Sequence, residues 1–285
     1  MNEFRPLISI IIACYNDAKY IEQSIGSALN QIYPNKEVIV VDDGSNEETK
    51  AVLKMLSSKI TKLITQENKG QSTARNVGIK EAKGEYILVL DSDDYFDSTF
   101  CEKAIAIFLE NKNVKIISSY VNRIYNDNKT DVFKPQGGQI KDFLLNNCAM
   151  GSTMFKKLDW EITNGYDEKM RNGFEDWEFY ICLLKSGGMA YVLPEPLFNY
   201  RVRNNSTTSK ANKIKYELLK YIYFKHQVLY KTNFELIISH LLGRVEREEI
   251  EKIKNSRRLE FKIGKAILKP IRYVKSILKY MINCF

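Results

Sequence analysis

The chain has 285 residues, of which 44% are apolar and 27% charged, and these figures exclude a disordered, a collagen-like or a disulfide-stapled small protein. Its net charge of +8 is divided unevenly, because residues 1–200 carry 23 basic and 28 acidic side chains whereas residues 201–285 carry 20 and 7. An acidic body joined to a basic tail predicts a catalytic or binding domain with an electrostatic anchor.

The cysteine pattern and the apolar runs indicate a cytoplasmic protein. The five cysteines form no CxxC or CxxH pair, so we expect reduced, mostly buried thiols rather than a zinc knuckle or a redox motif. No apolar run reaches the roughly 18 to 20 residues that a membrane-spanning helix needs. Residues 7–14 are apolar but lead directly into polar residues, which predicts a strand rather than a signal peptide.

The first 100 residues alternate between β-branched apolar runs and amphipathic segments. The runs predict strands, and the segments between them carry apolar residues at helical spacing. Strands are predicted at 8–13, 37–41, 63–64 and 86–90, and helices at 18–31, 49–57 and 74–83. This pattern predicts an open α/β domain whose mostly parallel sheet is covered on both faces.

The predicted strands end in polar residues. Tyr15 and Asn16 follow the first strand, Asp42 and Asp43 follow the second, and the acidic run 91–94 follows the last. Ligands bind beyond the carboxyl ends of the strands in open α/β sheets, so these residues are candidates for a binding site.

The pattern is less regular after residue 100. Residues 122–138 predict a long polar loop, and glycines and aromatic residues are scattered through 151–200, which is usual where a substrate is received. From about residue 211 only helical periodicity remains. We therefore predict a first domain of residues 1–210 and a basic, helical C-terminal extension of residues 211–285.

Three carboxylates in four residues, Asp91, Asp93 and Asp94, predict a divalent cation site. Mg²⁺ or Mn²⁺ would relieve their mutual repulsion, since these hard cations take carboxylates, water and substrate phosphates as ligands. A solvated acidic turn is the simpler alternative. An EF-hand is excluded because Phe96 stands where its loop needs glycine. A phosphatase of the haloacid dehalogenase type, with Asp91 as nucleophile, stays an alternative, although no later Gly-Asp motif follows.

Two further acidic clusters are ambiguous when each is taken alone. Asp42 and Asp43, which precede a glycine, fit a contact to a nucleotide and equally a turn or a helix cap. Asp176 lies in the run from Gly173 to Glu178 between aromatic residues, and it fits a general base as well as the acidic first turn of a helix.

Taken together, these motifs resemble those of the inverting glycosyltransferases of family 2, over roughly residues 5–205. The shared motifs are Ala13-Cys-Tyr-Asn16, Asp42-Asp-Gly-Ser45, Lys69-Gly-Gln-Ser-Thr-Ala-Arg-Asn-Val-Gly78, Asp91-Ser-Asp-Asp94, Gly165-Tyr-Asp167 and Glu175-Asp176. The resemblance implies the GT-A fold, a Rossmann-like α/β sheet with flanking helices, and a nucleoside-diphosphate sugar as donor.

The resemblance also implies which residues bind the donor. Tyr15 lines the base, Asp43 contacts it, and Arg75 helps to hold the nucleotide. Ala13 and Ser92 lie within the same motifs, and we include them among the nucleotide-sugar-binding residues.

For the chemical step, the resemblance implies a metal and a base. Asp91 and Asp93 correspond to the Asp-x-Asp signature, which serves the ribose and a Mg²⁺ or Mn²⁺ ion, and Asp94 is adjacent as a further candidate ligand. Asp176 corresponds to the general base.

One motif departs from the family pattern. Where the family often has Tyr-Arg-x-His, with the histidine near the metal and diphosphate, this chain has Tyr200-Arg-Val-Arg203. Arg203 cannot ligate a cation, but a guanidinium can form a bidentate contact with phosphate. We therefore expect the diphosphate to depend more on Arg203 and less on metal coordination.

Residues 262–285 predict an amphipathic helix. Basic residues from Lys262 to Lys279 and apolar residues from Ile263 to Phe285 fall on opposite arcs of a helix, which Pro270 should kink or restart. Such a helix can lie on an anionic membrane, or it can pack its apolar stripe on the body, and both interpretations stay open.

The sequence thus predicts a metal-dependent, inverting glycosyltransferase. The expected donor is a UDP-sugar and the expected acceptor a hydroxyl of a surface-polysaccharide or lipid-linked glycan, with the protein held peripherally at the inner face of the cell membrane. The alternatives are the phosphohydrolase and a non-catalytic, membrane-associated nucleotide-sugar-binding protein. No nucleic-acid partner is expected, because no helix-turn-helix, finger or RNP pattern accompanies the basic charge.

Overall fold

Strands and helices alternate through the first hundred residues, as predicted. The computed structural model describes residues 5–125, 129–203, 206–268, 270 and 273. The strands are β1 (Ile8–Cys14), β2 (Lys36–Asp43), β3 (Lys62–Gln66), β4 (Tyr86–Asp91), β5 (Tyr95–Phe96), β6 (Val114–Ile124), β7 (Thr130–Phe133), β8 (Met154–Lys156) and β9 (Met189–Arg201).

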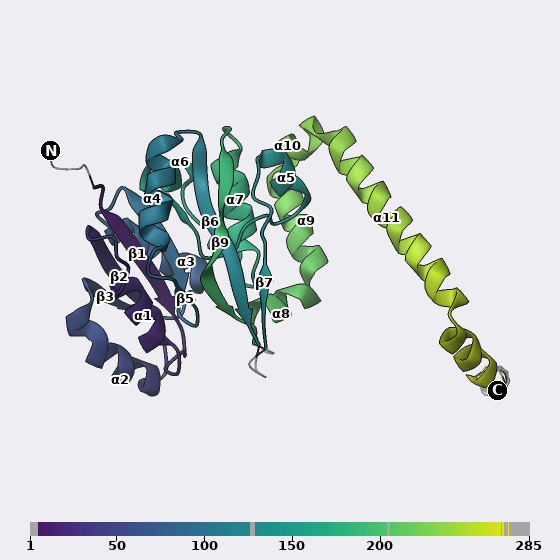
Figure 1. Cartoon of the computed structure of the whole chain (residues 1–285), viewed down its shortest axis with the longest axis horizontal. Helices are drawn as coiled ribbons and strands as arrows, with labels where there is room; N and C mark the ends of the chain where they lie inside the picture. Colours follow the sequence, from purple (N-terminus) through teal and green to yellow (C-terminus); the bar gives the residue numbers. More distant parts are fainter. Residues whose placement is uncertain (1–4, 126–128, 204–205, 269, 271–272, 274–285) are drawn as a thin grey trace. The chain divides into compact units, whose positions relative to one another are not determined.

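Helices of the first part of the chain flank the sheet, and further helices follow toward the C-terminal end of the described residues (Figure 1). They are α1 (Ile21–Leu29), α2 (Glu47–Leu56), α3 (Gln71–Glu81), α4 (Phe100–Glu110), α5 (Ile140–Leu145), α6 (Lys157–Thr163), α7 (Glu175–Leu184), α8 (Thr207–Lys213), α9 (Lys215–Lys225), α10 (Gln227–Thr232) and α11 (Phe234–Arg257), with a 3₁₀ turn at Ser57–Lys59.

All the strands of the described residues join one sheet in the order β3-β2-β1-β4-β8-β6-β9-β5, with β7 paired to β6. The pairs β3–β2, β2–β1, β1–β4 and β6–β9 are parallel, whereas β8 runs antiparallel to both of its neighbours. The predicted α/β fold with a mostly parallel sheet and flanking helices is confirmed. The prediction of a polar loop at 122–138 is wrong, because β6 extends to Ile124 and β7 returns beside it.

The alternation of β1 assigns its residues to two apolar layers. Ile8, Ile10 and Ile12 pack in the large core on the side of α1 and α4, whereas Ala13 packs on the opposite side against Ala74 of α3. A strand that is buried on both faces reads as a continuous apolar run, which is why this segment was identifiable.

The chain divides into two units, Met1–Tyr230 and Lys231–Phe285. Helices α8 and α9 bury Ala211, Leu218 and Ile222 and so belong to the first unit. In the second unit, α11 buries no side chain among the described residues. The division into two units does not test the predicted domain boundary at residue 210, which stays a prediction.

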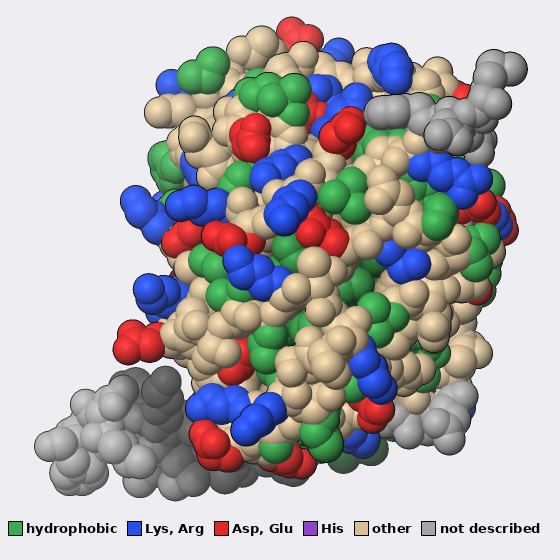
Figure 2. Space-filling view, turned by 90° about the vertical axis from the view of Figure 1, so that its left-hand side faces the viewer, with side chains coloured by type: hydrophobic (Ala, Val, Ile, Leu, Met, Phe, Trp, Pro, Cys, Tyr) green, Lys and Arg blue, Asp and Glu red, His purple; other side chains and the backbone are tan. Residues whose placement is uncertain are grey.

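The distribution of charged side chains on the surface and the burial of the cysteines agree with what the sequence predicts. Figure 2 shows basic and acidic side chains interspersed over the side on which β3 and α2 lie. Cys14, Cys101, Cys148 and Cys182 are buried and unpaired, as predicted, and Cys284 lies outside the described residues. No helix within the described residues is long and apolar enough to cross a membrane.

Candidate functional site

The carboxyl ends of β1, β2 and β4 meet at one edge of the sheet. The register pairs Ala13 with Asp91 and Cys14 with Asp42, so the polar residues that follow these strands are neighbours. Most of these residues line a cleft of about 1020 Å³. The predicted site residues that line it are Ala13, Tyr15, Asp43, Arg75, Asp91, Ser92, Asp93, Asp176 and Arg203.

Arg75 occupies the floor of this cleft. Its guanidinium is almost fully buried and contacts Asp91 Oδ1 at 2.6 Å and Glu175 Oε1 at 2.9 Å. Burial by itself lowers the pKa of Arg75, but Asp91, Tyr166 and Glu175 together raise it above its usual value, so the guanidinium stays charged. Burial raises the pKa of Glu175 to about 7, although the same guanidinium opposes this shift. Arg75 thus holds β4, α3 and α7 together in the cleft.

Asp176 lies in the first turn of α7 and points toward the same place. Asn147 donates a hydrogen bond of 2.9 Å to Asp176 Oδ2. Burial raises the pKa of the Asp176 carboxyl, as a general base requires. A Cβ on Gly151 would lie 3.7 Å from Asp176 Oδ2 and 3.8 Å from Asp91 Oδ2. The two carboxylates therefore face a position that carries no side chain.

Asp93 and Arg203 form an ion pair across the cleft. Arg203 Nη2 lies 2.5 Å from Asp93 Oδ2, and its Nη1 lies 2.9 Å from Asp17 Oδ1. Burial and the neighbouring Asp91 raise the pKa of Asp93 to about 6, against the opposing effect of Arg203. Arg203 is thus fastened to the acidic run 91–94 itself.

Asp94 differs from the other two carboxylates in its contacts. It is buried, it is not among the residues that line the cleft, and its Oδ1 accepts a hydrogen bond of 2.8 Å from the backbone N–H of Arg201. Its role as a metal ligand stays a prediction, and its observed contact fixes the end of β9.

The residues after β1 and β2 border the outer part of the cleft. Asp43 accepts hydrogen bonds of 2.8 Å from the backbone N–H groups of both Lys69 and Gly70, where α3 begins. Tyr15 is 52% exposed, so its ring is free to cover a planar ligand. Asp42 instead closes the turn after β2, since it accepts a hydrogen bond from the Ser45 N–H.

The carboxylates of Asp91 and Asp93 could supply some of the ligands of a hard divalent cation. The contacts already described engage Asp91 Oδ1 and Asp93 Oδ2, so the second oxygen of each carboxylate is the candidate ligand atom. One or two carboxylates with water and substrate phosphate are what Mg²⁺ or Mn²⁺ takes.

Some residues in or beside the cleft were not predicted from the sequence as site residues. Asp17 binds Arg203 and accepts a hydrogen bond from Ser92, and Gln71 donates one of 2.7 Å to Asp91. Asp17 belongs to the polar run after β1, and this position was the available signal. Asn147 lies in the irregular region, where no pattern marks it.

Comparisons with known proteins agree with this geometry. Residues 9–162 match the family model described as Glycosyl transferase family 2. The chain is 29% identical over 239 residues to the teichuronic acid biosynthesis glycosyltransferase named TuaG of Bacillus subtilis (strain 168), covering 82% of this chain and 92% of that protein. It is 31% identical to chondroitin synthase of Pasteurella multocida, covering 73% of this chain but 22% of that protein.

Solved structures show the same fold. The crystal structure of S. aureus TarS 1–349 in complex with UDP-GlcNAc has a TM-score of 0.68 and 19% sequence identity, covering 90% of this chain and 77% of that one. The complex of the same protein with UDP has a TM-score of 0.59 and 22% identity, covering 68% of this chain and 60% of that one. The match in fold extends beyond the residues of the family model.

Proposed function

The chain belongs to glycosyl transferase family 2, an enzyme family, and on this basis we propose that it moves a sugar from a UDP-sugar to a hydroxyl of a polysaccharide or lipid-linked glycan acceptor, with inversion. The observation that carries the proposal is the convergence of Asp176, Asp91 and Arg75 on the side-chain-free position at Gly151. The family match favours transfer over the phosphohydrolase and over a non-catalytic binding protein.

The donor is proposed to lie along the strand ends. Ala13, Tyr15 and Asp43 would receive the uracil base, because Tyr15 offers an exposed ring and Asp43 a carboxylate oxygen at the outer end of the cleft. Arg75, Asp91 and Ser92 would hold the ribose and the sugar side. Related structures with UDP or UDP-GlcNAc support this class of donor.

The diphosphate would lie between Asp93 and Arg203. Arg203 can exchange its contact with Asp93 for two hydrogen bonds to phosphate oxygens, which a planar guanidinium donates as a pair. A bound Mg²⁺ or Mn²⁺ would neutralise charge on the leaving diphosphate. Its ligands would be Asp93 and Asp91, with Asp94 as a further candidate.

The transfer is proposed to be one displacement. Asp176 removes the proton of the acceptor hydroxyl while that oxygen attacks the anomeric carbon from the face opposite the diphosphate. The bond from the anomeric carbon to the diphosphate oxygen breaks with its electron pair, so UDP leaves and the configuration inverts. Asn147 donates its hydrogen bond to Asp176 Oδ2, the oxygen that faces the Gly151 position, and so would orient the carboxylate for this step.

Two measurements on the full-length chain test the proposal. UDP-sugars should raise the melting temperature more than GDP- or CDP-sugars, because a ligand that binds only the native state stabilises it by about 2.7 kcal/mol at a hundredfold excess over Kd. UDP should then be released from the selected donor only with a glycan acceptor. Equal release without acceptor would identify a hydrolase, and no stabilisation by any sugar nucleotide would refute the donor class.

We further propose that the enzyme acts in the cytoplasm, peripherally at the inner face of the cell membrane. The support is the basic segment after α11, whose apolar residues Leu259, Phe261 and Ile267 are exposed. Most of the predicted amphipathic helix, including Ile271 and residues 274–285, lies outside the described residues.

A further inference from the structure

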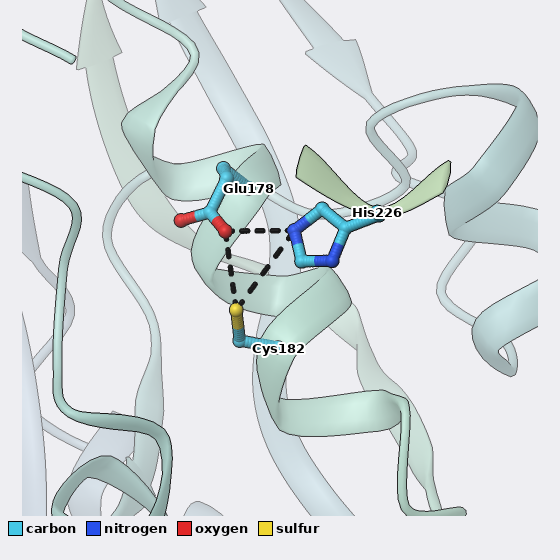
Figure 3. A group of neighbouring side chains, drawn as sticks. All are labelled: Glu178, Cys182 and His226. Carbon is cyan, nitrogen blue, oxygen red and sulfur yellow. Dashed lines mark hydrogen bonds and ion pairs between the residues drawn. The ribbon is translucent and has the colours of Figure 1, made fainter. Parts of the chain in front are cut away.

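A second group of chemically capable side chains lies apart from the cleft, between α7 and the end of α9. Glu178 and Cys182 are one helical turn apart on α7, and His226 follows the last residue of α9. Figure 3 shows both α7 side chains directed at the imidazole of His226. Glu178 is fully buried, Cys182 is 6% exposed and His226 8% exposed.

The three donor atoms are close enough to share one ion. Glu178 Oε1 lies 2.7 Å from His226 Nε2 and 3.1 Å from Cys182 Sγ, and this sulfur lies 3.9 Å from Nε2. The circle through these three atoms has a radius of about 2 Å, which matches Zn–N and Zn–O bonds of about 2.0–2.2 Å and approaches Zn–S bonds of about 2.3 Å. In a tetrahedral site the ion would lie out of the plane of these three atoms, and Glu178 Oε1 would move away from His226 Nε2, because ligand atoms at these bond lengths are roughly 3.3–3.6 Å apart.

A cation held by both oxygens of the Glu178 carboxylate would give each of them a partner, which only one of them has without it in the part of the chain that the structure describes. Oε1 is approached by Cys182, by His226 and by Lys225 Nζ at 2.9 Å, whereas Oε2 is buried without a hydrogen-bond partner among the described residues. A buried carboxylate oxygen without a partner is destabilising. Lys225 has a second anchor, since it also lies 2.6 Å from Asp167 Oδ2, so it can leave Glu178 without losing its charge partner.

We propose that Glu178, Cys182 and His226 form a structural zinc site that joins α9 to α7. Thiolate and imidazole select a borderline-soft ion such as Zn²⁺ over Mg²⁺, which takes only oxygen ligands. Cys182 releases its thiol proton on binding, and the charges of Glu178 and the thiolate then balance the ion. Water completes the tetrahedral shell.

The site has a consequence for the catalytic cleft. Helix α7 begins with Glu175 and Asp176, so an ion that ties α7 to α9 restrains the helix that carries the proposed base. The inference itself does not depend on the proposed transfer reaction, because it concerns metal content and ligand identity.

Cobalt substitution in the full-length chain tests the site. After treatment with a chelator and dialysis, Co²⁺ is titrated into wild type, Cys182→Ala and a matched control, Cys101→Ala, which removes a buried thiol on α4. We expect a sulfur-to-cobalt charge-transfer band that saturates at one ion per chain in wild type and in Cys101→Ala and is absent from Cys182→Ala. Carboxylates of the cleft cannot give this band. No band in wild type, or an equal band in Cys182→Ala, would overturn the proposal.

Two readouts keep the test decisive if Cys182→Ala does not fold. In wild type, equimolar Zn²⁺ should slow the alkylation of Cys182 at least tenfold, whereas Mg²⁺ should not. Peptide mass spectrometry measures the rate of this alkylation. His226→Gln should weaken Co²⁺ binding at least tenfold while the charge-transfer band remains at higher concentration. Alkylation at the same rate with and without Zn²⁺, or unchanged affinity in His226→Gln, would refute the site.

Discussion

Asp176 is the residue on which the proposed chemistry depends most. Replacing it by asparagine keeps the shape of the side chain and its place beside Asn147 but removes the group that accepts the proton. We expect Asp176→Asn to lower kcat by at least about 100-fold, the smaller end of what a general base contributes. Donor affinity should stay within about twofold of wild type. Initial rates of UDP release and calorimetric titration with UDP measure the two quantities.

Asp97→Asn is the matched control for this substitution. Asp97 accepts a hydrogen bond from the Thr99 N–H just before α4, and it is not among the residues that line the cleft. This variant should transfer sugar at close to the wild-type rate. If Asp176→Asn did the same, Asp176 would not be the base.

We expect Arg203 to determine how strongly donor binding depends on metal. In wild type its guanidinium is paired to Asp93 and Asp17 and can supply phosphate contacts without an ion. Removing divalent metal with EDTA should therefore weaken UDP binding by less than about tenfold in wild type, since one charge-assisted contact of about 1.5–3 kcal/mol remains. In Arg203→His, which restores a metal-ligating side chain, the same treatment should weaken binding by more than tenfold. Calorimetry with Mn²⁺ and with EDTA gives both ratios, and equal ratios in the two chains would contradict this role.

At the scale of elements, Gly78 explains how closely α3 lies on the sheet. A Cβ at this position would be 2.5 Å from Ile11 Cγ2 and 3.1 Å from Val41 Cγ2, side chains of β1 and β2. Gly78→Ala should therefore lower the free energy of unfolding by about 1–3 kcal/mol through overpacking. In α1, Gly26 has nothing within 4 Å of its Cβ position, so Gly26→Ala should instead raise stability by about 0.5–1 kcal/mol. Urea unfolding followed by circular dichroism compares the two; destabilisation of equal size in both variants would exclude the steric reason.

Strands β1, β2 and β4 were predictable because each is buried on both faces and therefore reads as a continuous apolar run, whereas the partly exposed edge strand β3 was predicted only at residues 63–64. The second half of the sheet was not, since β6 pairs with β9 from a distant part of the chain and its register is interrupted near Ser119 and Tyr120. In β9, Pro194 and Pro196 weaken the strand pattern, although proline is compatible with an irregular register.

In the candidate site too, contacts between residues far apart in the sequence could not be predicted. Strand-end residues such as Asp43 and Asp91 were identifiable because a parallel sheet brings its carboxyl ends to one edge. The contact of Asn147 with Asp176 and that of His226 with Glu178 join residues 29 and 48 positions apart, and no local pattern encodes them.

At the scale of the whole molecule, the basic excess of the C-terminal part is not continuous. Helix α11 carries five acidic and five basic side chains, so it contributes no net charge. The segment after it, residues 258–285, carries seven basic residues and one acidic residue. An electrostatic anchor therefore belongs to this last segment rather than to the whole extension.

Removing residues 258–285 should abolish binding to anionic vesicles. Each basic residue near such a surface contributes about 1 kcal/mol, and the exposed apolar side chains of the segment add burial in the interface. Co-sedimentation with phosphatidylglycerol vesicles at low salt should retain the full-length chain and release the shortened one, while phosphatidylcholine vesicles retain neither. A full-length chain with Lys262→Glu and Lys265→Glu separates charge from apolar contact, because its binding should weaken at least tenfold and lose much of its dependence on salt. Undiminished binding of the shortened chain would show that the membrane is not the partner of this segment.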